Sequence, residues 1–325
     1  MPESRQVQKV YETVKSAVFG HAVGDALGVP LEFVGRERLA VHPVTDMRAF
    51  GTHNLPSGSW SDDTSMTLCT LASLTERRAV VPEDMMLRFS QWANSGAYTP
   101  FGRAFGIGRT TFRAIADYLH GKPYGGAGER DNGNGSLMRI LPVPLYQHFC
   151  PRKDAGPEER IREVHAVSAL THAHRRSMEA CGIYAFIMES LLEEQTSPAI
   201  RRGLQNADRF YRTDPEHAAF SRLFSPGFAE TPADQIRSSG YVADTLEAAV
   251  WCLLTTGSYR ACVLRAVNLG GDTDTVAAVA GGLAGVLYGF DAIPPDWSSA
   301  LIRRGRLDDM CMAAARSWTE PPEAQ

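Results

Sequence analysis

The sequence predicts an all-α protein. Apolar and small residues recur about every 3.6 positions, as at Val10, Val14 and Ala17, which is the period of a helix with one buried face. Alternating apolar and polar residues, the pattern of half-buried strands, are hard to find over any length. Gly, Pro, Asn and Asp, which favour turns, separate the periodic segments. These observations favour helices packed on helices in one closed domain.

The helical period predicts the elements in chain order. Small or apolar residues define the first helix, and Met66, Cys69 and Leu71 repeat the pattern in the second. The longest apolar run, 276–290, contains several glycines and is shorter than the roughly 18–20 residues that span a bilayer, so we expect a buried core helix. The predicted helices cover 8–28, 63–76, 83–93, 103–119, 158–170, 175–194, 196–212, 242–255, 259–267, 275–289 and 297–316.

Composition excludes several classes of protein. Apolar residues make up 44% of the 325 residues and the net charge is −4, so the chain can bury a core and carries no basic stripe for nucleic acid. The N-terminal residues lack the pattern of a secretory signal. The six cysteines are scattered, and those within apolar helical segments are expected to be buried free thiols. We therefore expect a cytoplasmic protein with no membrane and no nucleic-acid partner.

Two long segments have the composition of loops. Residues 34–62 contain two prolines and several glycines, and residues 120–136 are rich in glycine. Loops of this length inside a compact domain are usually functional.

The first acidic cluster is Ser61, Asp62, Asp63 and Thr64, directly before an apolar helical segment. Ser, Asp and Thr are ordinary residues at a helix N-terminus, where a carboxylate also complements the helix dipole. Helix capping explains one aspartate but does not require two adjacent ones. Capping and metal binding both remain open for this cluster taken alone.

The second acidic cluster is Asp272, Thr273, Asp274 and Thr275, which follows two glycines and leads into another apolar segment. Residues two apart in an extended or turning backbone point to the same side, so both carboxylates can face one point. Two buried carboxylates are costly without a compensating positive charge. A functional site is therefore the better interpretation here.

The two clusters together offer four carboxylates and several hydroxyl groups. Hard oxygen ligands select Mg²⁺, Mn²⁺ or Ca²⁺ over Zn²⁺ or Cu²⁺. Two divalent cations would balance four negative charges, and paired cations of this kind recur in hydrolases. Because the clusters lie about 210 residues apart, a shared site requires one closed domain.

Three further segments carry residues of interest. The first helix has small residues at Ala22, Gly24, Ala26 and Gly28 and can approach another backbone closely. Glu32 follows Pro30, which ends that helix, and a carboxylate there is either paired or able to accept a proton from water.

The segment 131–139 has consecutive Asn-Gly pairs that expose N–H groups, which suits phosphate oxygens, although a tight turn is the alternative. The segment 105–111, with Gly108, is a weaker candidate of the same kind.

A Thr-His-Ala-His sequence at 171–174 precedes a predicted helix. Histidines two residues apart can bind a metal ion. More often such histidines cap a helix, pack, or form a hydrogen bond with a polar ligand, and we expect one of these three roles rather than metal binding.

These segments, in this order and spacing, resemble the ADP-ribosylglycohydrolase family over about residues 13–290. The resemblance implies a single-domain orthogonal helical bundle, with 1–318 forming the domain and 319–325 a disordered tail. It also implies two Mg²⁺ or Mn²⁺ ions, and cleavage of the C1″ bond between ADP-ribose and a protein or small-molecule acceptor, with ADP-ribose as product. We expect ADP-ribosylated arginine on protein as the substrate and a monomeric enzyme.

The resemblance also assigns roles to individual residues. Glu32, Asp62 and Asp274 would manage the proton chemistry. The implied metal ligands are Ser61, Asp62, Asp63, Asp272, Asp274 and Thr275. The implied substrate-binding residues are Gly108, Asn134, Gly135, Ser136, Met138, His172 and Tyr241.

One position departs from the family pattern. Several members have aspartate where this chain has Gly106, and that aspartate has been proposed to act in ring opening or proton transfer in the bacterial branch. The departure leaves the acid–base assignment and the preferred linkage open. The alternatives are hydrolysis of serine, nucleic-acid or small-molecule linkages, a non-catalytic ADP-ribose-binding or crystallin-like member, and a phosphohydrolase of another class.

Overall fold

A computed structural model of the chain describes residues 2–150 and 156–320 and confirms the all-α prediction. Its described residues form helices and turns with only isolated β-bridges between them. The α-helices are α1 Pro2–Gly28, α2 Arg36–Val41, α3 Asp62–Arg77, α4 Pro82–Ser95, α5 Arg109–Leu119, α6 Pro142–Phe149, α7 Pro157–Ala169, α8 Arg175–Glu193, α9 Ser197–Tyr211, α10 Val242–Leu254, α11 Tyr259–Asn268, α12 Thr273–Tyr288, α13 Pro295–Ala300 and α14 Arg304–Thr319.

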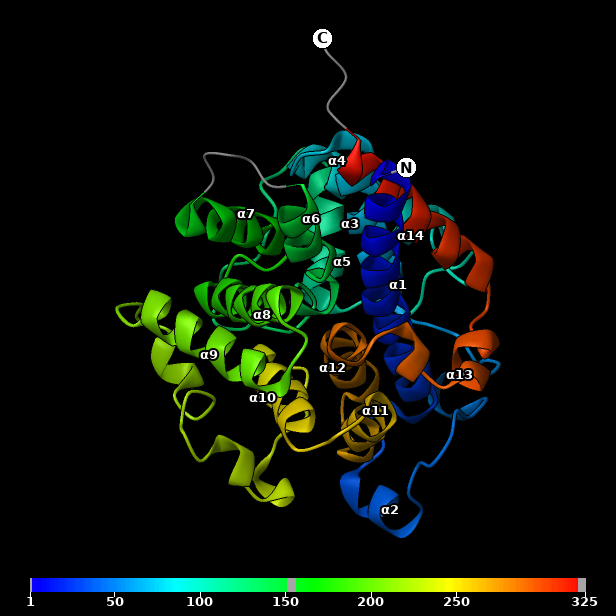
Figure 1. The fold of residues 1–325 in the computed structure, drawn as a ribbon, viewed down its shortest axis with the longest axis vertical. Helices are drawn as coiled ribbons and strands as arrows, with labels where there is room; N and C mark the ends of the chain where they lie inside the picture. Colours follow the sequence, from blue (N-terminus) through cyan, green and yellow to red (C-terminus); the bar gives the residue numbers. More distant parts are fainter. Residues whose placement is uncertain (1, 151–155, 321–325) are drawn as a thin grey trace.

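Helices α1 and α12 lie side by side at the centre of the bundle (Figure 1). Helix α12 contacts α1, α8, α10 and α11, and it is buried along nearly its whole length. Helices α3 and α14 pack against α1 and against each other. This arrangement joins both ends of the chain to one core.

Small residues allow α1 and α12 to touch through their backbones. A Cβ atom added to Gly24 would lie 2.0 Å from the carbonyl oxygen of Ala277, and one added to Gly20 would lie 2.4 Å from that of Gly281. At the end of α1, the same test at Gly28 places Cβ 2.3 Å from Asp274 Cα. The predicted close approach is therefore confirmed, and it brings the C-terminal end of α1 against the N-terminal end of α12.

Four details of the sequence prediction need correction. The helix expected over 103–119 begins at Arg109, because Gly106 adopts a positive φ of 81° and the preceding residues form a loop. The helix expected over 297–316 is two helices, separated where Arg303 adopts φ 55°. The loop 34–62 contains α2, and the unpredicted α6 begins at Pro142.

Other expectations are confirmed within the described residues. Cys69, Cys181, Cys252 and Cys262 are buried free thiols. No helix there is long and apolar enough to span a bilayer. The tail expected over 319–325 falls largely on residues 321–325, which lie outside the described part of the chain, while Thr319 still belongs to α14.

Candidate active site

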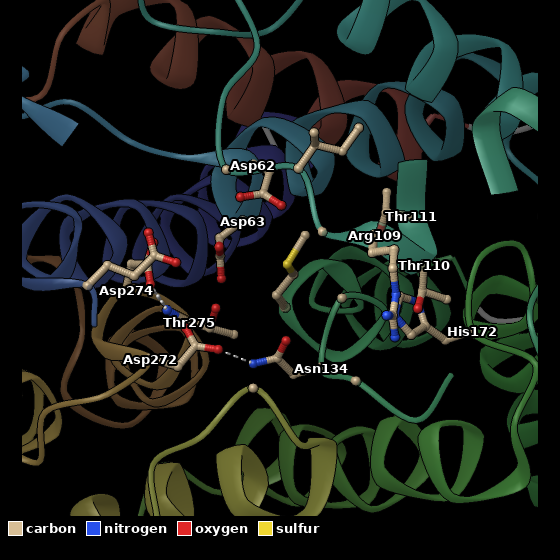
Figure 2. Close-up of a pocket in the computed structure, with 18 of the residues that line it drawn as sticks. Asp62, Asp63, Arg109, Thr110, Thr111, Asn134, His172, Asp272, Asp274 and Thr275 are labelled. Carbon is tan, nitrogen blue, oxygen red and sulfur yellow. Dashed lines mark hydrogen bonds between the residues drawn. The ribbon is translucent and has the colours of Figure 1, made fainter. Parts of the chain in front are cut away.

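The N-terminal ends of α3 and α12 meet beside a pocket of about 510 Å³ (Figure 2). It is lined by Glu32, Phe33, Asp62, Asp63, Gly106, Ile107, Gly108, Arg109, Thr110, Thr111, Arg130, Gly133, Asn134, Gly135, Met138, His172, Gly240, Asp272, Asp274 and Thr275. The fold thus brings together both acidic clusters, which lie far apart in the sequence, and adds the Asn-Gly segment and His172.

The carboxylates form one compact group. Oxygen atoms of Glu32, Asp272 and Asp274 lie within 4.8 Å of one another. Asp62 and Asp63 face them from α3 (Figure 2). Burial, and then repulsion between neighbouring carboxylates, raises the pKa of Asp62, Asp63 and Asp274 well above the usual value.

A sixth carboxylate, Asp25 of α1, completes the group and was not singled out from the sequence. Its oxygens accept hydrogen bonds from the backbone N–H groups of Ser61 and Thr64, each at 3.0 Å, and from the Thr64 hydroxyl at 2.6 Å. Asp25 therefore caps α3 from another helix. Burial raises its pKa to about 6 in spite of these hydrogen bonds.

The residues at the start of α3 have distinct surroundings. Ser61 Oγ caps the helix by accepting from Asp63 N–H at 3.2 Å and donates to Asp63 Oδ2 at 2.9 Å, but Ser61 does not line the pocket. Asp63 Oδ1 is buried and has no hydrogen-bond partner among the described residues. An unpaired carboxylate oxygen in a cluster of buried acids is costly unless a proton or a cation compensates its charge.

Backbone contacts hold Glu32 beside the second cluster. Phe33 N–H donates to the Gly271 carbonyl at 2.7 Å, and Gly271 N–H donates to the Val34 carbonyl at 2.9 Å. Glu32 is half-buried and pairs with His53 Nε2. Its pKa is raised, mainly by burial, while the hydrogen bond from His53 acts in the opposite direction.

The Asn-Gly segment is tied to the second acidic cluster through Asn134. Its Nδ2 donates to Asp272 Oδ2 at 2.8 Å and to Thr245 Oγ1 at 2.9 Å. Its backbone N–H donates to the Gly240 carbonyl at 3.1 Å. The segment is thus held in a fixed position between the acidic cluster and His172.

Of the other residues expected to bind substrate, four line the pocket and two do not. Gly108 lines the pocket at the N-terminus of α5, and Gly135, Met138 and His172 also line it. Ser136 lies behind the wall, fully buried, and accepts a hydrogen bond from Ser168 at 2.9 Å. Tyr241 does not line the pocket, although its neighbour Gly240 does.

Arginine and threonine side chains opposite the acidic group were not singled out from the sequence. Figure 2 shows Arg109, Thr110 and Thr111 at the end of the pocket near His172, away from Asp272 and Asp274. Arg130 also lines the pocket. The available sequence signal was the Gly-rich turn before α5, which had marked residues 105–111 as a weak anion-binding candidate. One end of the pocket is therefore suited to cations and the other to anions.

Comparisons with known proteins identify the family of the chain. A model of the ADP-ribosylglycohydrolase family matches residues 6–323. The chain is 33% identical over 317 residues to ADP-ribosylarginine hydrolase Tri1 of Serratia proteamaculans, covering 95% of this chain and 80% of that relative. It is 32% identical to the ADP-ribosyl-[dinitrogen reductase] glycohydrolase of Rhodospirillum rubrum, covering 90% of this chain and 91% of that one.

A solved structure described as an ADP-ribosylglycohydrolase-related protein complex superposes with a TM-score of 0.78 at 32% identity, covering 95% of this chain and 99% of that one. The family match spans nearly the whole chain and the fold agrees with it. The chain belongs to the ADP-ribosylglycohydrolase family.

Proposed function

We propose that the protein is a metal-dependent hydrolase that cleaves the C1″ bond of ADP-ribosylated arginine and releases ADP-ribose. The observation that carries this proposal is the division of one pocket into an acidic end and an end with Arg109, backbone N–H groups and His172. ADP-ribose would occupy both ends. Its anionic diphosphate suits the end with Arg109, and the diol of its distal ribose suits cations held at the acidic end.

The acidic group fits divalent cations. Its donors are hard oxygens, one of which, Asp63 Oδ1, is buried without a hydrogen-bond partner among the described residues. Two Mg²⁺ or Mn²⁺ ions held there would supply positive charge and Lewis acidity to the ribose diol and to water. The residues that would hold them are Asp62, Asp63, Asp272, Asp274 and Thr275, with Ser61 fixing the position of Asp63.

The remaining chemistry falls to side chains around C1″. Glycosidic cleavage passes through an oxocarbenium-like state, which nearby negative charge stabilises. Glu32 lines the pocket, has a raised pKa and is not one of the proposed metal ligands, and it accepts the proton of the attacking water. The diphosphate rests against the N-terminal turn of α5 and the Asn-Gly segment.

Arginine as the acceptor is supported by the relatives named ADP-ribosylarginine hydrolase, each 33% identical to this chain. The test is a panel of ADP-ribosylated acceptors, with arginine, serine and nucleic-acid linkages, incubated with Mg²⁺, Mn²⁺ or EDTA. We expect the arginine linkage to be cleaved fastest and EDTA to stop the reaction. Binding of ADP-ribose without turnover would instead indicate a non-catalytic member, and release of AMP would indicate a phosphohydrolase.

Glu32→Gln is expected to lower kcat by about a hundredfold or more, the usual contribution of a positioned general base. The amide keeps the size of the side chain but cannot take up a proton. Single-turnover hydrolysis of ADP-ribosyl-arginine measures the effect, and Glu37→Gln, an exposed change in α2, is the control. A kcat for Glu32→Gln equal to that of the control would remove Glu32 from the proton chemistry.

Gly106→Ala is expected to lower kcat/KM at least about tenfold by displacing a carboxylate of the metal site. A Cβ atom at Gly106 would lie 2.3 Å from Asp62 Oδ1, so Asp62 must move. Gly102→Ala is a matched control in the same loop, because Gly102 has a similar φ of 72° and its added Cβ meets nothing within 4 Å. Equal activity of the two variants would show that Asp62 tolerates the displacement. With this backbone, an aspartate at position 106 would meet Asp62 in the same way.

A further inference from the structure

A chain of hydrogen bonds runs behind the pocket wall from Arg139 through Thr171 to His172. Arg139 Nη2 donates to Thr171 Oγ1 at 2.9 Å and to the Val167 carbonyl at 3.1 Å. Thr171 Oγ1 lies 2.8 Å from His172 Nδ1. All three residues are buried, and the Arg139 guanidinium stacks over the Phe89 ring.

The chemistry of the three groups gives the chain a direction. A guanidinium has donors and no acceptor, so the Thr171 oxygen receives a hydrogen from Arg139. The Thr171 hydroxyl then has one hydrogen to donate, and the acceptor beside it is His172 Nδ1. If Nδ1 carried a hydrogen instead, the Thr171 oxygen would receive two hydrogens, and its own would have no acceptor recorded in the described part of the chain.

His172 is also fixed in orientation. On one side of it Gly126 N–H donates to the Thr171 carbonyl at 3.1 Å, and on the other Ala173 N–H donates to the Gly126 carbonyl at 2.8 Å. A Cβ atom on Gly135 would lie 2.7 Å from His172 Cε1, and one on Gly133 would lie 3.6 Å from Nε2. The Nε2 edge therefore faces the Asn-Gly segment, and among the described residues no hydrogen bond to Nε2 is recorded.

The ring is held in its neutral form. Burial, and then the nearby Arg139 charge, lowers the pKa of His172 to about 3. Asp131 acts in the opposite direction, and Arg113 also lowers the pKa. A neutral imidazole has one donor and one acceptor, and which nitrogen is the donor depends on the hydrogen bond that the other nitrogen makes.

We infer that Arg139 and Thr171 are positioning residues that fix His172 as the Nε2–H tautomer, so that the pocket offers a neutral N–H donor to an acceptor oxygen of its ligand. For an ADP-ribose ligand, which rests on the proposed function, that acceptor is an oxygen of the diphosphate or of an adjoining ribose. A ligand with an N–H donor at the same place is excluded, because two donors would face each other.

The tautomer can be measured directly on the unmodified protein. The chain has nine histidines, and ¹⁵N labelling of their rings with long-range ¹H–¹⁵N correlation distinguishes the protonated from the unprotonated nitrogen of each. The signals of His172 are those missing from the His172→Gln variant. We expect one neutral Nε2–H species in the metal-free protein without ligand. An Nδ1–H species or an imidazolium would overturn the inference.

Variants test whether Thr171 carries the effect. Thr171→Val preserves the shape of the side chain but removes the hydroxyl, so we expect a mixture of His172 tautomers and an ADP-ribose affinity about tenfold weaker in calorimetry. Thr171→Ser should restore both. Thr70→Val is the matched control, because Thr70 is also buried but donates to the Met66 carbonyl within α3. A Thr171→Val protein with the wild-type tautomer would overturn the role of Thr171.

The outcomes separate this inference from the proposed function. An Nε2–H tautomer in a protein that binds no ADP-ribose would support the positioning role and contradict the function. Tight ADP-ribose binding by a protein whose His172 is the Nδ1–H tautomer would contradict the positioning role and leave the proposed function supported. The wild-type spectrum decides the inference even if a substitution prevents folding.

Discussion

Replacing Asp274 by asparagine is expected to reduce turnover of ADP-ribosyl-arginine by about a thousandfold or more, equivalent to roughly 4 kcal/mol of activation free energy. Asp274 is buried at the N-terminus of α12, and its carboxylate lies within 4.8 Å of those of Glu32 and Asp272. The amide keeps the shape of the side chain but removes one negative charge that a cation would need. Steady-state kinetics at saturating Mg²⁺ or Mn²⁺ measures the loss.

The control for this substitution is Asp308→Asn. Asp308 pairs with Lys15 between α1 and α14, away from the pocket, at 3.0 Å, so we expect turnover close to that of the wild type. Normal hydrolysis by the Asp274→Asn protein would contradict both the metal site and the proposed mechanism. Loss of ADP-ribose affinity without loss of kcat would place Asp274 in substrate binding alone.

Removal of divalent cations is expected to lower the melting temperature, and to do so more at about pH 8 than at about pH 6. The pKa of Asp25 is raised to about 6, and burial and mutual repulsion raise the pKa values of Asp62, Asp63 and Asp274 as well. A carboxyl group whose pKa is higher in the folded than in the unfolded state binds more protons when folded. The metal-free protein therefore loses stability as pH rises through that folded-state pKa.

Cations reverse this loss because they replace the protons. At a hundredfold excess over Kd, binding to the folded state alone adds about 2.7 kcal/mol. For 325 residues, with an unfolding entropy of about 2.1 cal/mol/K per residue, this raises the melting temperature by about 4 °C. Differential scanning fluorimetry in EDTA or Mg²⁺ at the two pH values measures the shift.

The Asp274→Asn protein supplies the internal control for this experiment. With one fewer buried carboxylate it should melt higher than the wild type in EDTA at about pH 8 and gain less from Mg²⁺. A wild-type melting temperature that is the same in EDTA and Mg²⁺ at both pH values would mean that no cation binds the carboxylate group.

The acidic clusters illustrate what could be predicted from this sequence. Both precede apolar helical segments, and their oxygen donors and combined charge predicted one shared site. The fold brings both clusters to one pocket. Asp25 could not be found in the same way. It lies in the middle of a small-residue helical pattern, and its role as a cap of α3 depends on which helix packs beside it.

Local backbone geometry accounts for the errors in the helix boundaries. The helical period of the sequence continues through Arg303, but this residue adopts φ 55° and separates α13 from α14. Nothing in the side chain of Arg303 favours that conformation. The positions of Ser136 and Tyr241 relative to the pocket also depend on local backbone geometry that the sequence pattern does not reveal. Both belong to segments that line it, but the turn of the chain directs Ser136 to the far side of the wall and leaves Gly240 in place of Tyr241.

The contact between α1 and α12 sets the order of events during synthesis. Thr273 Oγ1 donates to the Gly28 carbonyl, 245 residues away along the chain. A ribosome must therefore release most of the protein before the last carboxylates can reach Asp25 and Glu32. An N-terminal fragment of the nascent chain carries four of the six carboxylates, Asp25, Glu32, Asp62 and Asp63, and the group is complete only when Asp272 and Asp274 join them on closure of the bundle.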